Sequence, residues 1–297
     1  MATFAELADS TLLYMAGFST SQDAATHLTS GIDSDDTTLV VADASAIGRG
    51  LLEIDDELVW ADSVDQTSGS ISVPPYGRGF RSSTAASHSA GSRVVASPMI
   101  PRKIAKDAIN DTIRALWPDL YGIASTSFTY VAGTYTYPLP ADAESVTQVQ
   151  WQDSTTASEW LDVRRYTVDG NADTGVFPTG ANITIKDNVI VGRTVRVVYT
   201  KQPTVLSDAG DVFSTVTGLP ASCEDLVRLG AAYRLVPFLD VPHLSGMSAE
   251  ADFTANQRPV GGAAQLSRYL LQTYQLRLEQ EKNRLGQLYP VRVHYTA

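Results

Sequence analysis

The strongest pattern in the chain is the stretch GAAQLSRYLLQTYQLRLEQEKNRLGQLYPVRVHYTA, residues 262–297. No proline interrupts residues 263–288, and leucines and tyrosines recur there at helical spacing. The pattern predicts one long helix, whose roughly 25 residues would extend about 37 Å. Pro290 then ends the helix, and apolar and polar residues alternate after it as they do in a β-strand.

This helix is apolar on two neighbouring faces. The first face carries Leu266, Tyr269, Leu270, Thr273 and Leu276, and the second carries Leu271, Tyr274, Leu278 and Leu285. Such a broad apolar arc exceeds what one contact needs. We therefore expect packing between subunits through Leu266, Leu270, Leu271, Tyr274 and Leu278. The strand-like end has no evident partner within the chain, so we expect the helix and this strand to be shared with other subunits.

Composition limits the class of protein. The chain has 297 residues, of which 43% are hydrophobic, enough for two or three small domains with a sizeable core. The first residues lack the pattern of a secretory signal, and no apolar run approaches the ~20 residues that span a bilayer. Cys223 is the single cysteine, which excludes an internal disulfide and a cysteine-based metal cluster. We expect a protein that matures in a reducing cytoplasm.

The negative charge lies mainly in the first third. Residues 1–98 hold 13 acidic and 4 basic side chains, and the net charge of the whole chain is −11. A protein that grips nucleic acid by its phosphates needs a basic face, so this class is disfavoured. An acidic surface past which DNA slides without sticking stays possible, and solubility alone is the simpler explanation.

Three more helices are expected. Thr3 and Glu6 form a capping box for a helix over residues 3–16, and a polar linker follows at residues 19–26. Apolar spacing predicts a second helix over 102–117. A third, over 223–236, begins at a capping box and should end at Pro237 and Pro242, before a loop of low order at 243–262.

Two regions between these helices have the texture of β-structure. Residues 27–98 hold short strands and a hairpin at 51–64 with Asp55-Asp56 at its turn. Residues 125–205 hold further strands, of which 194–200 alternates most clearly. The expected fold is α+β: a helical bundle with a long C-terminal helix, carrying two inserted antiparallel β modules. The expected domains are 1–26, the first bundle helix and linker; 27–98, the small β module; 99–124, a bundle helix; 125–205, the second β domain; and 206–297, the remaining helices and the docking strand.

Acidic clusters offer the first candidates for chemistry. Asp33, Asp35 and Asp36 could surround a hard cation, but no glycine or distal glutamate follows at the spacing of a calcium loop, so a solvated loop is favoured. Asp55, Asp56 and Glu57 could serve as a glycosidase pair. Adjacent residues at a hairpin tip should instead point apart and stay solvated.

Other candidates are weaker still. Gly77-Arg78-Gly79 lacks the helix and lysine of a phosphate loop, so its glycines are expected to supply unusual backbone angles. His27, His88, His243 and His294 are scattered, and none has the spacing of a metal ligand pair. Cys223 opens a helix, where a thiolate could be favoured, but a buried cysteine is the simpler interpretation. Tyr233, Tyr269, Tyr274, Tyr289 and Tyr295 are better explained as packing residues than as base-stacking ones. We expect no enzyme activity, no cofactor and no metal.

Two stretches resemble a known class of protein. GRGFRSSTAASHSAGSRVV, within residues 74–95, together with the hairpin LEIDDELV before it, resembles a small β module of phage structural proteins. PASCEDLVRLGAAYRL, from Pro220, and the terminal helix with its strand resemble the helical part of adaptors. The whole chain is thus similar to a head-to-tail connector (adaptor) protein of a tailed bacteriophage.

The resemblance implies a structural role in the virion neck. It implies a twelve-copy ring, assembled in the bacterial host cytoplasm, that docks beneath the portal protein, meets downstream tail, stopper or terminator proteins and surrounds the DNA channel without sequence-specific binding. It further implies that the C-terminal segment docks onto the portal. The docking residues would be Tyr289, Val291, Arg292, Val293, His294 and Tyr295. Ring closure needs head-to-tail contacts, which suits a helix with two apolar faces.

Two other functions stay open. One is a different tail component, such as a tail-completion or tail-tip protein whose β modules bind host glycans. The other is a hydrolase of surface polymer that uses the acidic clusters. The C-terminal strand separates the adaptor from the glycan-binding tail component, because an adaptor should need the strand for docking and a glycan-binding protein should not.

Overall fold

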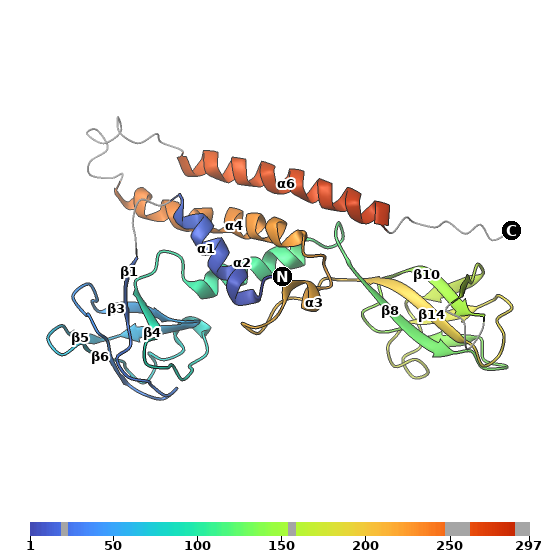
Figure 1. Cartoon of the computed structure of the whole chain (residues 1–297), viewed down its shortest axis with the longest axis horizontal. Coiled ribbons are helices and arrows are strands. Elements are labelled where there is room, and N and C mark those ends of the chain that lie inside the picture. Colours follow the sequence, from blue (N-terminus) through green and yellow to red (C-terminus); the bar gives the residue numbers. More distant parts are fainter. Residues whose placement is uncertain (19–22, 154–158, 247–261, 289–297) are drawn as a thin grey trace. The chain divides into compact units, whose positions relative to one another are not determined.

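The computed structural model describes residues 1–18, 23–153, 159–246 and 262–288 (Figure 1). The chain divides into two compact units. Residues 2–112 and 225–275 belong to the first unit, and residues 113–224 and 276–297, together with Met1, belong to the second. Each unit combines helical segments with an antiparallel β module.

Five helices lie in the described part of the chain. They are α1 (Phe4–Ala16), α2 (Arg102–Ala115), α3 (Phe213–Thr217), α4 (Cys223–Gly246) and α6 (Gly262–Leu288). The long C-terminal helix is therefore confirmed, with 27 residues. The helix predicted over 102–117 is confirmed as α2.

Helix α1 begins with the predicted capping box. The Thr3 hydroxyl accepts from the Glu6 backbone N–H at 3.2 Å, and the Glu6 carboxylate accepts from the Thr3 N–H at 2.9 Å. These two bonds satisfy N–H groups that have no partner within the helix itself. One stripe of the helix is buried: Phe4, Leu7, Ala8, Thr11 and Met15.

Polar contacts join three helices of the first unit. Arg102, at the start of α2, pairs with Asp9 of α1 at 2.8 Å. Arg234 of α4 donates from Nε to the buried Thr112 hydroxyl of α2 at 3.1 Å. These contacts link α2 to α1 and to α4, while the expected bundle architecture stays a prediction.

Helix α4 does not end where the sequence predicted. It continues through Pro237 and Pro242 to Gly246. A proline removes one helical hydrogen bond and bends the helix, at a cost of about 3 kcal/mol, but it need not end a helix whose flanks are packed. Leu235 and Val236, directly before the first proline, are buried. Their burial favours continuation of the helix.

The β module of the first unit contains seven strands. They are β1 (Ala24–His27), β2 (Thr38–Val40), β3 (Gly50–Ile54), β4 (Glu57–Ala61), β5 (Ser63–Asp65), β6 (Ser70–Ser72) and β7 (Arg93–Ala96). One sheet has the order β1-β7-β3-β4 and the other the order β2-β6-β5, and all pairings are antiparallel. The hairpin predicted around Asp55-Asp56 is confirmed as β3–β4.

Strand β1 corrects one prediction. The linker expected over residues 19–26 contains the start of a strand, because Ala24 pairs with Ala96 and His27 with Arg93. Its four residues, Ala-Ala-Thr-His, carry little apolar patterning of their own. Pairing with a partner about seventy residues later creates this strand, and a local pattern cannot reveal such a partner.

The core of this module lies between its two sheets and loops. Its buried residues are Leu28, Ile32, Leu39, Val41, Ala44, Ile47, Leu52, Ile54, Val59, Ala61, Ile71, Val73 and Val94. Burial of each large aliphatic side chain contributes about 1.5–3 kcal/mol. Because β3 and β4 supply residues from both sides of the hairpin turn, this core fixes the position of the turn.

The described residues of the second unit's β module also form seven strands. They are β8 (Gly122–Thr129), β9 (Thr136–Pro138), β10 (Ser145–Gln152), β11 (Trp160–Asp162), β12 (Tyr166–Asp169), β13 (Asn182–Ile185) and β14 (Thr194–Lys201). They form antiparallel sheets of order β11-β10-β14-β8 and β12-β13-β9. Figure 1 labels β8, β10 and β14 of the first of these sheets. The predicted alternation of β14 is confirmed, since Val195, Val197 and Tyr199 are buried.

The structure supports the fold class at the level of α+β, with four antiparallel sheets among the described residues and a long C-terminal helix. The domain boundaries expected from the sequence stay predictions. No helix in the described part of the chain is long and apolar enough to cross a membrane.

Candidate functional site

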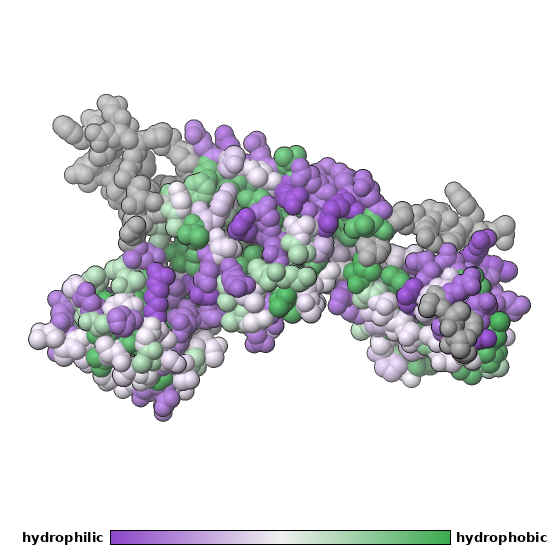
Figure 2. Space-filling view, in the orientation of Figure 1, coloured by the Kyte–Doolittle hydropathy of each residue, from purple (hydrophilic) through white to green (hydrophobic). Residues whose placement is uncertain are grey.

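Helix α6 presents three large apolar side chains to solvent: Tyr269, Leu276 and, as its last residue, Leu288, which is 61% exposed. Tyr269 is 58% exposed and Leu276 is 64% exposed. Residues seven apart lie on the same side of a helix, two turns from each other. Figure 2 shows that the visible surface along α6 is mostly hydrophilic and carries isolated hydrophobic residues. Tyr269 and Leu276 are therefore candidates for contacts with another subunit.

The five residues expected at a subunit interface differ in accessibility. Leu270 is completely buried, so it packs inside its own subunit and has no surface to offer a neighbour. Leu266, Leu271, Tyr274 and Leu278 are partly buried. Their remaining surface leaves a contact with a second subunit as a prediction.

Tyr274 packs within the first unit at a close approach of helices. A Cβ atom added at Gly230 of α4 would lie 2.8 Å from Tyr274 Cε2 and 2.4 Å from Thr112 Cγ2. Only a hydrogen side chain at position 230 leaves room for both neighbours. Gly230 therefore permits the contacts of α4 with α2 and α6.

A buried ionic cluster holds the C-terminal half of α6 in the second unit. Glu281 is 3% exposed, and Oε2 accepts from Ser222 Oγ and from Arg284 Nε, each at 2.9 Å. Arg277 Nη2 lies 3.1 Å from Oε1. A buried carboxylate is stable only when it is paired and hydrogen-bonded, and this one has both kinds of partner. The cluster joins α6 to the first turn of α4.

Cys223 lies beside this cluster and is 1% exposed. Burial, with a smaller contribution from the Glu281 charge, raises the pKa of its thiol to about 12. The thiol is therefore protonated at neutral pH. A thiolate at the start of this helix is therefore not favoured, because the cost of burying its charge outweighs the favourable effect of the helix N-terminus. The simpler interpretation, a buried cysteine, is confirmed.

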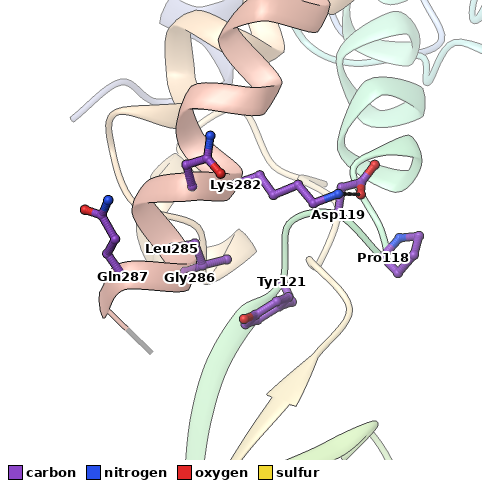
Figure 3. Close-up of a pocket in the computed structure, with 8 residues that line it drawn as sticks. Pro118, Asp119, Tyr121, Lys282, Leu285, Gly286 and Gln287 are labelled. Atoms are coloured by element: carbon purple, nitrogen blue, oxygen red, sulfur yellow. Dashed lines mark hydrogen bonds and ion pairs between the residues drawn. The ribbon is translucent and has the colours of Figure 1, made fainter. Parts of the chain in front are cut away.

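An open hollow of about 710 Å³ borders the last turns of α6 (Figure 3). Lys282 Nζ donates to Asp119 Oδ1 at 2.7 Å across one side of it. Tyr121, which directly precedes β8, lines the same hollow as Leu285 and Gln287 of α6. The end of α6 thus lies beside the start of β8.

The predicted docking residues lie outside the described residues. These are Tyr289, Val291, Arg292, Val293, His294 and Tyr295. Their position in the sequence places them directly after the last turn of α6, which ends at Leu288. Their role stays a prediction.

A second cluster lies in the first β module and surrounds Glu57. The Glu57 side chain is 1% exposed. Arg78 donates to both of its carboxylate oxygens, from Nε at 2.8 Å and from Nη2 at 3.0 Å. The backbone N–H groups of Gly79 and Ala86 donate to it as well, at 2.9 and 3.1 Å. The expectation that the carboxylates at this hairpin tip all stay solvated is therefore wrong for Glu57.

Arg78 uses every N–H group it has. Besides its two bonds to Glu57, it donates to the carbonyl oxygens of Asp33, Asp36 and Ala86. The loop considered for calcium thus turns its backbone carbonyls toward a guanidinium. Among the described residues no group of histidine, cysteine and acidic side chains could hold a metal ion.

His88 completes the cluster. Its Nδ1 lies 2.8 Å from Asp55 Oδ2, and its Nε2 lies 2.9 Å from Glu57 Oε2. Two ionised carboxylates can both accept only if the ring is doubly protonated. The hydrogen bond to Glu57 raises the pKa of His88, against the opposing effect of burial, and Asp55 adds to the rise.

The pKa of Glu57 moves in the other direction. Burial alone would raise it, but the hydrogen bonds from His88, Arg78 and the backbone of Gly79 and Ala86 lower it to about 2. With His88 and Arg78 both engaged by protein groups, the cluster offers a substrate little to bind. The cluster links the β3–β4 turn to three loops, which contain Asp33 and Asp36, Arg78 and Gly79, and Ala86 and His88.

Sequence spacing could not reveal this cluster. Arg78 follows Glu57 by 21 residues and His88 follows it by 31, and no sequence motif links residues at these separations. His27 lies in β1, and the side chains of His243 and His294 lie outside the described part of the chain. The expected role of the glycines is confirmed for Gly79, which has φ +58.

Comparison with protein families matches residues 84–279 to the family described as SU10 adaptor protein. The match includes α2, the second β module, α4 and most of α6. Comparison with curated proteins gave no match for this chain.

Proposed function

Because the chain belongs to the SU10 adaptor protein family, a family of phage structural adaptors, we propose that it forms the adaptor ring between portal and tail. The family match is the observation that carries this proposal, since it spans about two thirds of the chain. A virion component that contacts other virion proteins follows from the family. The position at the portal, the ring and its twelve copies are the proposed part.

The surface of α6 supports a role in assembly. A closed ring requires each subunit to present one surface to the next and a different surface to the previous one. Tyr269 and Leu276 give α6 an exposed apolar side in addition to its buried side. One side of the helix would serve the subunit, and the other would serve its neighbour.

The channel and the partners follow from the same proposal. Genomic DNA passes through the ring without sequence-specific binding, which suits a chain with a net charge of −11. The C-terminal segment adds a strand to the portal, and downstream tail, stopper or terminator proteins bind the opposite side. The role is structural, without catalysis.

Co-sedimentation tests the docking step. Full-length protein and a variant that lacks residues 289–297 are each mixed with portal rings from the same phage and separated on a sucrose gradient. We expect the full chain to move with the portal and the shortened chain to stay at the top, because the segment makes the contact.

Circular dichroism of both proteins controls for folding. The shortened chain should keep its helix and strand content, since terminal segments outside the core rarely decide folding. Equal co-sedimentation of both proteins would move the docking site away from the C-terminus. Absence of co-sedimentation for the folded full-length chain would remove the portal as its partner.

A further inference from the structure

Strand β8 has a long free edge. In the described part of the chain, β8 pairs with β14 on one side and with no strand on the other. It has eight residues, whereas the other edge strands have three to five. An edge of this length presents a row of unpaired N–H and C=O groups to any strand that can reach it.

Helix α6, which the C-terminal segment follows in sequence, ends beside the start of β8. Gln287 and Leu285 of α6 line the hollow together with Tyr121, the residue before β8 (Figure 3). The last turn of α6 therefore lies at the end of the sheet where β8 starts. A segment that follows β8 from this point would run parallel to it.

The lengths agree. Residues 289–297 are nine, and an extended chain of this length spans about 30 Å. The eight residues of β8 span about 26 Å. The segment can therefore cover the whole edge without any change in α6. Pro290 would fall at the first positions of the added strand, where a missing N–H group is tolerated.

The alternation of apolar and polar side chains in the segment also matches the two faces of β8. With residue 289 opposite Gly122, the apolar Val291, Val293 and Tyr295 fall opposite Ala124, Thr126 and Phe128. These three β8 residues pair with Tyr199, Val197 and Val195 of β14, which are buried.

On the opposite face of the sheet, the polar residues of the segment match the exposed residues of β8. The polar Arg292, His294 and Thr296 fall opposite Ser125, Ser127 and Thr129. These three β8 residues are exposed. Both faces of the sheet would thus continue with the correct polarity, and a shift of one residue would reverse both.

We propose that in the free subunit the C-terminal segment, residues 289–297, adds to the edge of β8 as a parallel fifth strand. The segment is then held in its own subunit before assembly, and its high effective concentration favours this contact over one with a second copy. Its release onto the portal rests on the proposed function, but the contact in the free subunit does not.

A disulfide trap tests the contact. Ser127→Cys and His294→Cys are combined in the full-length chain, since neighbouring strands lie at the distance that a disulfide bridges. Ser127→Cys with Val293→Cys is the matched control, because residue 293 would point to the opposite face. The native Cys223 is buried and stays unreactive. The protein is oxidised mildly at low concentration, and the products are separated without reductant.

We expect an intramolecular disulfide in the first variant to form at least roughly tenfold faster than in the control. Equal rates in both variants would overturn the proposal, as would covalent dimers whose yield rises with concentration. If the cysteine variants misfold, hydrogen exchange replaces the trap: deletion of residues 289–297 should speed amide exchange in β8 at least roughly tenfold, and unchanged exchange would overturn the proposal.

Portal rings added before oxidation separate this inference from the proposed function. Suppression of the disulfide by the portal supports both. A disulfide that forms equally with and without portal upholds the contact in the free subunit and counts against portal docking by this segment.

Discussion

Glu57 lies at the centre of a buried ionic cluster in the first β module. It lies directly after the turn between β3 and β4, and its carboxylate gathers donors from loops 21 to 31 residues later. Each interaction is charge-assisted and shielded from solvent, which makes it stronger than a surface pair. Three acidic residues follow one another in the sequence, and nothing local distinguishes the buried Glu57 from Asp55 and Asp56, which are less buried. Only the folded chain brings Arg78 and His88 to it.

Removal of the Glu57 charge should destabilise the protein strongly. Glu57→Gln leaves Arg78 and His88 buried without their common counter-charge, which we expect to cost about 3–5 kcal/mol. Asp62→Asn is the matched control, because its ion pair with Arg49 lies at the surface and should contribute at most about 1 kcal/mol. Urea unfolding of both variants measures the difference. Similar losses for the two variants would contradict the role given to the cluster.

The same cluster should make stability depend on pH. The pKa of His88 is raised above its ordinary 6.5, so its contribution is complete below that value and is lost as pH rises through the folded pKa. The pKa of Glu57 is lowered to about 2, so its contribution is complete above 4.5 and is lost as pH falls toward 2.

Glu53 makes the stability of the fold depend on pH in the same direction as His88 does. Burial raises its pKa to about 7, although the Arg102 N–H and charge oppose this, so its effect favours the folded state below 4.5 and declines as pH rises to 7. We expect the midpoint of thermal unfolding to be highest under mildly acidic conditions. Glu53→Gln should flatten the slope between pH 4.5 and 7. A midpoint that rises steadily from pH 5 to 8 would contradict these assignments.

At the scale of elements, the helices were the best predicted part of the fold. Their signals are local: the Thr3–Glu6 capping box, the apolar stripe of α1 and the long pattern of α6. Strand β1 and the continuation of α4 past Pro237 were missed, because pairing and packing with distant residues decide them. The hollow beside the end of α6 could not be predicted either, since its lining comes from two distant segments.

Two glycines test the packing of the helices. Gly230→Ala would push a methyl group into Thr112 and Tyr274, and overpacking of this kind costs about 1–3 kcal/mol. Gly286→Ala on α6 is the control, because a Cβ there meets nothing within 4 Å and helix propensity favours alanine by up to about 1 kcal/mol. Thermal unfolding should therefore move in opposite directions. A stabilising Gly230→Ala would show that α2, α4 and α6 are not packed closely at this point.

The exposed side of α6 can be tested apart from stability. Leu276→Glu places a charge on a residue that is 64% exposed, so the free energy of unfolding should change by no more than about 0.5 kcal/mol. Assembly on the portal should nevertheless fall, because the charge would be buried between subunits.

Gln275→Glu adds the same charge one residue away, on another side of the helix, and serves as the control. Assembly is scored by co-sedimentation of each variant with portal rings. Full assembly of Leu276→Glu would show that this side of α6 faces solvent in the ring.

At the scale of the whole molecule, the family match and the structure lead to one account. The chain is a phage adaptor with an acidic first third, two antiparallel β modules and a long helix that ends at the proposed docking segment. The resemblance drawn from the sequence agrees with the family at the level of a phage adaptor. The ring, its copy number and the portal depend on contacts between chains, which the sequence and fold of one chain do not contain.

Negative-stain imaging of the full-length protein mixed with portal rings from the same phage tests this account most directly. We expect a second ring stacked coaxially on the portal, formed from subunits that show no ring alone. Portal rings that stay bare, while circular dichroism shows the added protein to be folded, would contradict the adaptor ring and indicate a different tail component.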